Sequence, residues 1–416
     1  MRDLQPVRGT RDLLPEEQRR HRAVIDTARA ITARHGYAEM ATPIFEFTEV
    51  FKRTLGTDSD VVMKEMYTFP VREEGDTVTL RPEGTAGFAR AYITNGLQQN
   101  LPVKAFYTGP MFRHERPQKG RMRQFHQIGV ELLGPGKPLA DVETIAMGKQ
   151  LLDALGLGES VTLELNTLGD HASRRAYREA LVAYFEQHRD RLSKDSLERL
   201  HRNPLRILDS KDAGDQAVVA GAPDFDAYLN DESRAFFQAV CDGLDALGIA
   251  YTRNRRLVRG LDYYTHTCFE FTTDALGAQG TVLAGGRYDG LIETMGGPAT
   301  PGTGWAAGVE RLAMLLADAP EPERPIAVVP ASAAEEIAAM RLAQELRGAG
   351  VAVDMAYGGN LKKRLKRANT VNARGAVILG GDELARDEAT VRDLDTGTQE
   401  AVALDRVTAY VGALRR

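Results

Sequence analysis

Apolar and polar positions near the N-terminus follow the period of a helix and then that of strands. After Pro15, four apolar residues recur with the spacing of one helix face and predict a helix that ends near Gly36: Val24, Ile25, Ala28 and Ile31. Residues 37–47 are β-like, and residues 78–81 predict a short strand. This part of the chain therefore predicts a long helix followed by strands.

A strand-to-helix turn is predicted directly after Pro82, where the pattern becomes helical again. Glu83, Gly84 and Thr85 would lie at this turn, which presents backbone N–H groups and short side chains together. An ordinary capping turn and a ligand-binding turn both remain open for this segment.

The stretch from Met111 to Leu132 reads as strand, basic loop, strand. From Arg123 onward, one strand face would carry an aromatic ring, an amide, a glycine and a carboxylate, in the order Arg123, Phe125, Gln127, Gly129, Glu131. The other face is mostly apolar and suits a core: Gln124, His126, Ile128, Val130, Leu132. We therefore expect the first face to line a pocket.

The middle of the chain alternates between the two periods. Helical spacing covers residues 141–155, and strand-like patterns lie at 161–166, at 257–271 and from Gly280 onward. From His171 to Leu247 the chain is charged and helical, which predicts an inserted helical module. The string GTGWAAGVERLAMLLA, from Gly302, predicts a strand that turns into a helix.

A proline-rich acidic segment, residues 317–325, predicts a linker between domains. Beyond it, strands and helices alternate as βαβαβ, which indicates a small domain on a largely parallel sheet. The strands are expected at 325–330, 351–356 and 376–379, and the helices at 333–346 and 361–373.

The net charge of the 416 residues is −5, which excludes a uniformly basic surface for binding nucleic acid. Basic residues are instead concentrated locally. Between positions 104 and 123, six of them stand against Glu115 alone: Lys104, Arg113, Arg116, Lys119, Arg121 and Arg123. Residues 361–374 hold six basic residues and no acidic one. A solvated helix face and contact with phosphate both remain open for the second group.

Cysteine usage and hydropathy point to an intracellular protein. Two cysteines, Cys241 and Cys268, can form neither a disulfide framework nor a cysteine-based zinc site. The N-terminus has no apolar signal region, and no run approaches the roughly 18 apolar residues that span a membrane. We expect a soluble, cytoplasmic protein without a membrane partner.

Four dispersed arginines suggest a triphosphate site: Arg113, Arg121, Arg259 and Arg311. Guanidinium groups bind phosphate oxygens bidentately and neutralise the charge that develops in an in-line displacement. Neither a Walker-type loop nor a kinase signature is present, so a nucleotide would be held in another way.

Several strings resemble the motifs of class II aminoacyl-tRNA synthetases, and specifically those of bacterial histidyl-tRNA synthetases. FRHE and GVER resemble generic class II motifs, whereas LVRGLDYYTHTCFEF from Leu257 and AGGRYDGL from Ala284 resemble the histidine-specific ones. The resemblance implies ATP-dependent ligation of L-histidine to tRNA(His) through a histidyl-adenylate. A non-catalytic, histidine-sensing regulatory subunit of ATP phosphoribosyltransferase and a synthetase for another amino acid are the alternatives.

The resemblance also implies an α+β fold. It consists of an antiparallel sheet of six to seven strands flanked by helices, a helical insertion and a C-terminal α/β anticodon-binding domain. The expected ranges are 1–170 and 251–320 for the catalytic domain, 171–250 for the insertion and 325–416 for the C-terminal domain. The chain is expected to form a homodimer through the first class II motif, which the helix after Pro15 together with Pro43 resembles.

Residue roles follow from the resemblance position by position. Arg113 and Arg259 would act at the α-phosphate of ATP as the catalytic cations, and Arg121 at the distal phosphates. Phe125 and Arg311 would enclose the adenine ring, with Glu115 near its edge. Mg²⁺ would be held by the phosphates, without a site made by protein alone.

For histidine, the resemblance places the α-ammonium group at Glu83, Thr85 and Gln127. Glu131 and Tyr264 would bind the imidazole nitrogens. Tyr263 and Tyr288 would form pocket walls. For tRNA(His), the loop residues Arg116, Gln118 and Lys119 would approach the acceptor end.

Overall fold

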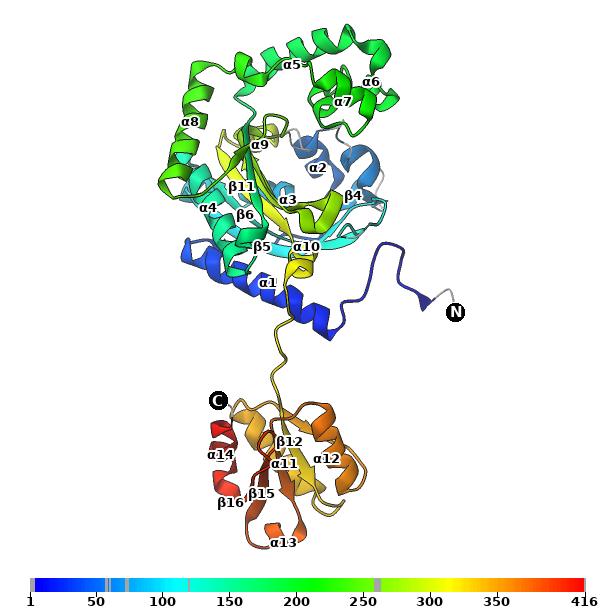
Figure 1. Cartoon of the computed structure of the whole chain (residues 1–416), viewed down its shortest axis with the longest axis vertical. Helices are drawn as coiled ribbons and strands as arrows, with labels where there is room; N and C mark the ends of the chain where they lie inside the picture. Colours follow the sequence, from blue (N-terminus) through cyan, green and yellow to red (C-terminus); the bar gives the residue numbers. More distant parts are fainter. Residues whose placement is uncertain are drawn as a thin grey trace. The chain divides into compact units, whose positions relative to one another are not determined.

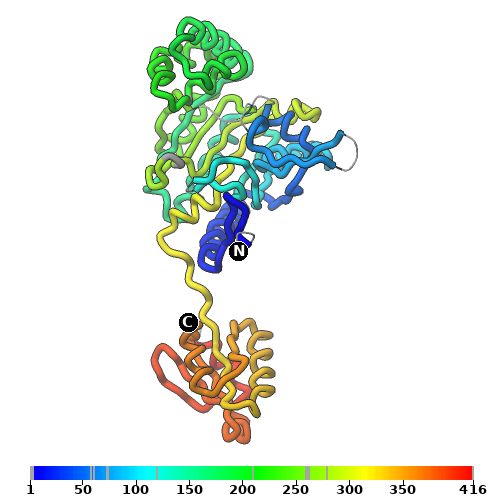
Figure 2. Tube along the Cα trace, turned by 90° about the vertical axis from the view of Figure 1, so that its right-hand side faces the viewer, coloured from blue at the N-terminus to red at the C-terminus, as the bar shows by residue number. Residues whose placement is uncertain are grey.

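The computed structural model describes residues 4–56, 59, 61–71, 75–118, 120–257 and 263–414, without the side chains of 209, 278 and 279. It divides into two compact units (Figures 1 and 2). The N-terminal unit is Met1–Pro320 and the C-terminal unit is Glu321–Arg416. The division falls inside the proline-rich segment, where few apolar residues are available to pack. Among the described helices, none is both long and apolar enough to cross a bilayer.

An eight-stranded sheet forms the centre of the N-terminal unit, in the order β1-β5-β6-β11-β10-β9-β7-β8. Its strands are β1 (Ala38–Glu39), β5 (Val103–Phe112), β6 (Gln124–Leu133), β7 (Thr162–Thr167), β8 (Thr252–Arg253), β9 (Thr265–Thr272), β10 (Thr281–Arg287) and β11 (Gly302–Gly308). The six inner strands are antiparallel, which confirms the predicted sheet. The edge strands β1 and β8 run parallel to their neighbours and, at two residues each, are too short to show a period.

Four helices share a core with this sheet: α1 (Pro15–Arg34), α4 (Pro138–Ala154), α8 (Asp231–Ala246) and α10 (Val309–Leu315). Helix α1, predicted after Pro15, buries Val24, Ala28 and Ile31 in this core. Helix α8 lies inside the segment expected as an insertion, but Val240 and Leu244 belong to the same core because α8 packs on α4.

The segment before α8 forms a helical lobe with its own core, seen above the sheet in both overall views (Figures 1 and 2). Its helices are α5 (His171–Glu186), α6 (Lys194–Arg199) and α7 (Ala213–Val219). The buried carboxylate of Asp215 on α7 holds the start of α6 and the segment before α7, since it accepts hydrogen bonds from the hydroxyls of Ser193, Ser196 and Ser210 at 2.7, 2.6 and 2.6 Å. We call residues 171–229 the inserted module.

A small sheet in the order β2-β4-β3 packs beside α2 (Thr48–Leu55) and α3 (Thr85–Thr94). Its strands are β2 (Phe45–Phe47), β3 (Tyr67–Pro70) and β4 (Thr77–Leu80). The predicted strand at 78–81 is confirmed as β4, and the β-like segment 37–47 is divided between β1 and β2. The remaining helix of the unit is α9 (Leu291–Thr294). Single helical turns lie at Val61–Glu65, Leu97–Asn100, Gly158–Ser160, Arg189–Arg191, Pro204–Asp209, Phe225–Tyr228 and Asp274–Gln279.

The C-terminal unit has a five-stranded sheet in the order β13-β12-β14-β15-β16. Its elements are β12 (Ile326–Pro330), α11 (Glu336–Gly348), β13 (Val353–Met355), α12 (Leu361–Thr370), β14 (Gly375–Leu379), α13 (Gly381–Leu384), β15 (Glu388–Asp393), β16 (Gln399–Ala403), a turn at Leu404–Arg406 and α14 (Val407–Ala413). The parallel strands β13, β12 and β14 confirm the predicted βαβαβ arrangement. The antiparallel β15 and β16 were not predicted, since β16 is exposed at every position except Val402 and has no apolar period.

Candidate active site

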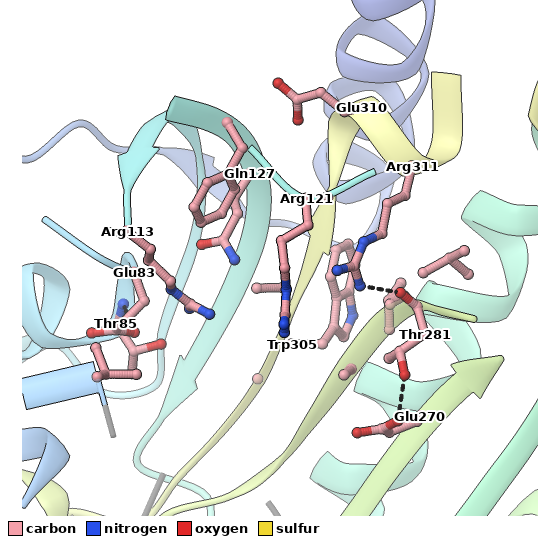
Figure 3. Close-up of a pocket in the computed structure, with 18 of the residues that line it drawn as sticks. Glu83, Thr85, Arg113, Arg121, Gln127, Glu270, Thr281, Trp305, Glu310 and Arg311 are labelled. Atoms are coloured by element: carbon pink, nitrogen blue, oxygen red, sulfur yellow. Dashed lines mark hydrogen bonds between the residues drawn. The ribbon is translucent and has the colours of Figure 1, made fainter. Parts of the chain in front are cut away.

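A cavity of about 530 Å³ opens in the N-terminal unit against β6, β10, β11 and the start of α10 (Figure 3). It gathers twelve of the residues expected at the site: Glu83, Thr85, Arg113, Glu115, Arg121, Phe125, Gln127, Glu131, Tyr263, Tyr264, Tyr288 and Arg311. These residues lie up to 228 positions apart in the sequence. The sheet brings distant segments together, for example by pairing β6 with β11.

Strand β6 forms one wall of this pocket through its alternation. Phe125, Gln127 and Glu131 face the cavity, whereas Ile128 and Val130 are fully buried in the core on the other side. At Gly129 the ring of Tyr107 from β5 occupies the place where a side chain would stand. The glycine is therefore required by close packing.

Glu131 is the most enclosed carboxylate of the pocket, with an exposure of 1 %. The hydroxyl of Thr85 donates to its Oε1 at 2.7 Å, and the hydroxyl of Tyr288 donates to Oε2. Burial raises the pKa of Glu131 to about 8, even though these hydrogen bonds favour the charged form. Glu131 therefore exchanges a proton close to neutral pH.

Three tyrosine rings line the pocket near Glu131. The ring of Tyr263 lies 4.7 Å from that of Tyr264 and packs edge-on against Tyr288 at 5.8 Å between centroids. Tyr288, expected only as a wall, donates its hydroxyl to Glu131. Aromatic surface and a buried acceptor together suit a flat ring that carries an N–H group.

The turn after Pro82 supplies the polar end of the pocket. The carboxylate of Glu83 accepts from the backbone N–H groups of Thr85 and Ala86, each at 2.7 Å, and so caps α3. Burial raises the pKa of Glu83. On β6, the buried Oε1 of Gln127 receives no hydrogen bond from any residue that the structure describes. This oxygen is an acceptor that a cationic ligand could use.

A cationic region begins beside this turn and extends across the pocket to α10 (Figure 3). Arg113 donates to the carbonyl of Pro82 at 2.9 Å and lies 5.4 Å from the centroid of the Phe125 ring. Nε of Arg121 lies 2.5 Å from Oε2 of Glu115, which is 3.9 Å from Arg113 in turn. Such closely placed guanidinium groups favour an anion between them.

Arg311 closes the cationic end from the start of α10. It donates to the carbonyls of Gly120 at 3.1 Å and Thr281 at 2.7 Å. Burial and the nearby Arg121 and Arg113 lower the pKa of Arg311, so the three cations act on one another.

For the other four predicted residues, the structure gives the position of two. Arg259 and Lys119 are outside the described residues. Arg116 and Gln118 are exposed on the loop, whose tip is closed by two backbone hydrogen bonds of 2.9 Å between Gln118 and Arg121.

The assignment of Lys104 to the basic loop was wrong. Lys104 is inside β5, and its ammonium group donates to Glu143 on α4 at 2.6 Å. Strand β5 begins before Lys104, because the apolar neighbours of this lysine, Val103 and Ala105, pack against a hydrophobic cluster.

Sequence reasoning missed other pocket residues, and those with polar or large aromatic side chains include Glu65, Arg206, Glu270, Thr281, Trp305 and Glu310. Arg206 comes from the inserted module, where no motif marks it. Trp305 stands in the GTGWAAG string that was read only as a strand, and its indole N–H is bonded to the carbonyl of Thr144 at 3.0 Å.

Comparison with known proteins finds a family match in each of the two units. Residues 9–312 match the histidyl-tRNA synthetase family model, and residues 326–414 match the model of an anticodon binding domain. The chain is 64 % identical over 405 residues to a histidine–tRNA ligase of Rhodospirillum rubrum, covering 97 % of each. It is 58 % identical to that of Gluconacetobacter diazotrophicus, covering 100 % of each. The crystal structure of apo S. aureus histidyl-tRNA synthetase superposes with a TM-score of 0.82 at 35 % identity, covering 99 % of this chain and 100 % of that one.

Proposed function

This chain belongs to the histidyl-tRNA synthetase family, and we propose that the pocket of its N-terminal unit is where histidine and ATP react. The overall reaction ligates L-histidine to tRNA(His) with ATP through a histidyl-adenylate. A regulatory subunit of ATP phosphoribosyltransferase and a synthetase for another amino acid are not favoured, because relatives matched over nearly the whole chain are histidine–tRNA ligases.

The observation that carries the assignment of the histidine site is the buried Glu131 among tyrosine rings. An imidazole N–H donates to the carboxylate, and Tyr264 meets the second nitrogen. Tyr263 and Tyr288 enclose the ring, with Tyr288 also orienting Glu131. An apolar side chain of similar shape would leave the Glu131 carboxylate without its partner, so it is rejected.

The α-ammonium group of histidine takes the acceptors at the other end of the same pocket. The buried Oε1 of Gln127 lacks a donor among the described residues, and Thr85 and Glu83 stand at the neighbouring turn. A cation placed here satisfies that oxygen and relieves the desolvation of the Glu83 carboxylate. The amino acid is thereby oriented with its carboxylate toward Arg113.

ATP occupies the cationic end. Arg113 binds the α-phosphate and Arg121 the distal phosphates, displacing the ion pair between Arg121 and Glu115. Glu115 then lies near the edge of the adenine ring, which is enclosed by Phe125 and Arg311. The family resemblance assigns Arg259, outside the described residues, to the α-phosphate as a second catalytic cation.

Positioning and charge stabilisation supply the rate of the first step. The histidine carboxylate attacks the α-phosphorus in line and the bond to the pyrophosphate oxygen breaks, so that charge builds up on oxygens faced by guanidinium groups. The 3′-hydroxyl of the terminal ribose of tRNA(His) then attacks the mixed anhydride and releases AMP. Neither step needs a covalent bond to the protein.

A magnesium ion would come with ATP and would neutralise part of the charge of its phosphates. Among the described residues, the cluster of potential metal ligands is His21, His126 and Glu310, and two imidazoles do not match the oxygen preference of Mg²⁺. The pocket carboxylate Glu115 is paired with Arg121. These donors do not form a magnesium site made by protein alone.

Three surfaces serve tRNA(His). The loop carrying Arg116, Gln118 and Lys119 meets the acceptor end, and the inserted module braces the acceptor arm. In the C-terminal unit, Arg364 and Arg367 on α12 pair with Glu336 and Asp354. By contrast, the ammonium groups of the exposed lysines of α12 have no hydrogen-bond or ion-pair partner among the described residues; these are Lys362, Lys363 and Lys366. These lysines contact phosphates of the anticodon arm.

A second copy of the chain covers the small sheet. Phe45, Phe47 and Phe69 are 58, 58 and 47 % exposed. Phe47 and Phe69 flank Val78 of β4 from opposite sides, and Phe45 is two residues from Phe47, so the three rings share one face. Such an apolar face suits a homodimer interface.

ATP–pyrophosphate exchange across all twenty amino acids tests the proposal. Exchange with histidine alone, together with charging of tRNA(His), is the expected result. Exchange that depends on another amino acid, or none with histidine, would remove the assignment of the pocket.

A further inference from the structure

Where β6 and β11 stop pairing, a side chain accepts the hydrogen bond that the next backbone N–H of β6 donates. Their ladder ends with Gln127 opposite Gly308, and α10 begins at the next residue of β11. The backbone N–H of His126, one step further along β6, donates instead to both carboxylate oxygens of Glu310, each at 2.9 Å. Glu310 thus replaces the carbonyl that the strand would have provided.

The same carboxylate also bonds the side chain of His126. Nδ1 of its ring lies 2.9 Å from Oε1 of Glu310, so backbone and ring hold one acceptor group. Glu310 is 6 % exposed, and the ring of His21 from α1, 3 % exposed, packs edge-on against the ring of His126 at 5.7 Å. A buried carboxylate held by several donors is a rigid connection, because breaking it leaves the charge unsolvated.

The chain neighbours of this pair are the two residues placed around adenine. Arg311 follows Glu310 and Phe125 precedes His126, and both line the pocket. In Figure 3, Glu310 and Arg311 leave α10 in different directions, Arg311 toward Thr281 and Glu310 away from it. A bond between Glu310 and His126 therefore fixes the separation of Phe125 and Arg311.

We propose that Glu310 is a positioning residue for the adenine ring, which sets the width of the slot between Phe125 and Arg311 through its bonds to His126. This inference rests on the proposed function of the pocket. The carboxylate does not touch the phosphates in this arrangement, so its removal changes nucleoside recognition and leaves the phosphate end intact.

The ligand atoms of His21, His126 and Glu310 also lie within 4.8 Å of one another, the spacing of a possible metal site. Both oxygens of Glu310, however, already accept hydrogen bonds from His126. The geometry is therefore that of a completed hydrogen-bonded connection between β6 and α10.

Three variants test the proposal in the full-length protein. Glu310→Gln keeps the size of the side chain but sets an NH₂ group against an N–H donor. Glu310→Asp keeps the charge with a shorter reach, and His126→Phe removes the ring bond while leaving the backbone bond. Glu159→Gln, at an exposed glutamate on a distant turn, is the matched control.

Adenosine and pyrophosphate separate the two ends of the nucleotide site. In Glu310→Gln we expect the affinity for adenosine and the KM for ATP to worsen about 10- to 100-fold, as for loss of a charged hydrogen bond. Inhibition by pyrophosphate and the KM for histidine stay within about twofold of wild type. Glu310→Asp recovers part of the loss, and His126→Phe shows a smaller one.

Equal weakening of adenosine, pyrophosphate and histidine would show a general structural role and overturn the proposal. So would a lower melting temperature with unchanged adenosine affinity. A stoichiometric transition metal in purified wild type that is lost in Glu310→Gln would replace it with a metal site. Each variant is compared with wild type. Failure of the proposed function would be seen separately, because wild type itself would then show no histidine-dependent exchange.

Discussion

At the scale of single residues, Glu131 is a titratable carboxylate that is almost completely buried in the pocket. Its pKa is about 8, against 4.5 for an ordinary glutamate, because burial penalises the charged form. The ligand-free protein thus holds this proton more tightly than the unfolded chain does. Its contribution to stability is complete below about pH 4.5 and is lost as the pH rises through 8.

Glu131→Gln should therefore stabilise the ligand-free protein while abolishing its activity. Glutamine is neutral at every pH, so the gain in free energy of unfolding should grow from pH 5 to pH 8, where it reaches at least about 1 kcal/mol. Histidine-dependent exchange should fall by about 100-fold or more. Urea unfolding at both pH values is the measurement, and a gain that does not change with pH would contradict the assigned titration.

Single residues also show where sequence reasoning could reach the pocket and where it could not. The face of β6 with Phe125, Gln127 and Glu131 was predictable, because a strand has a period of two. The hydrogen bond from Tyr288 to Glu131 was not, since it joins residues 157 positions apart. Arg206 was equally hidden, because its place depends on how the inserted module packs.

At the scale of elements, the pocket depends on how closely β11 approaches β6. Gly304 pairs directly with Glu131, and a Cβ at Gly304 would lie 2.2 Å from the backbone oxygen of Val130 and 2.5 Å from Oε2 of Glu131. The glycine-rich string from Gly302 was predicted as a strand entering a helix, and β11 followed by α10 confirms this. The glycines of this string indicated an irregular strand. They did not indicate which side chain needs the space, because Glu131 belongs to another strand, β6.

Gly304→Ala should impair histidine recognition more than ATP recognition. The added methyl group displaces Glu131 from its bonds, so the KM for histidine should rise about tenfold or more, with a loss of about 1–3 kcal/mol in free energy of unfolding. Exchange kinetics and urea unfolding measure both effects. Gly348→Ala in α11, where a Cβ meets nothing within 4 Å, is the control. Equal rises in both KM values would show a general distortion of the sheet.

At the scale of the whole molecule, the chain has two units with separate cores. The pocket proposed for the adenylate step is lined by residues of the N-terminal unit, whereas the exposed lysines of α12 belong to the C-terminal unit. Changes on α12 should therefore act on tRNA and leave the first reaction untouched.

Reversing the charge of Lys362 and Lys366 together should raise the KM for tRNA(His) about tenfold or more and reduce the salt dependence of charging. ATP–pyrophosphate exchange should remain within about twofold of wild type. Arg341→Glu, at an exposed position on α11, controls for a charge reversal elsewhere in the same unit. If charging by the double variant matches that of Arg341→Glu, the lysines do not contact tRNA.

The apolar face of the small sheet belongs to the same scale. Phe45→Glu with Phe69→Glu should convert a dimer into a 45.6 kDa monomer in sedimentation velocity, because charges cannot be buried at such a contact. Tyr357→Glu is the control, since this ring is 86 % exposed in the C-terminal unit. A wild-type protein that already sediments as a monomer would end the proposal of a dimer.

Arg206 ties the inserted module to the reaction chamber. Excising the module to obtain a minimal enzyme would therefore remove a positive charge from the chamber along with the surface proposed to brace the RNA. Slower adenylate synthesis in such a truncated enzyme would not by itself mean that RNA communicates with the chemistry. A substitution at Arg206 alone, in the intact chain, separates the two causes.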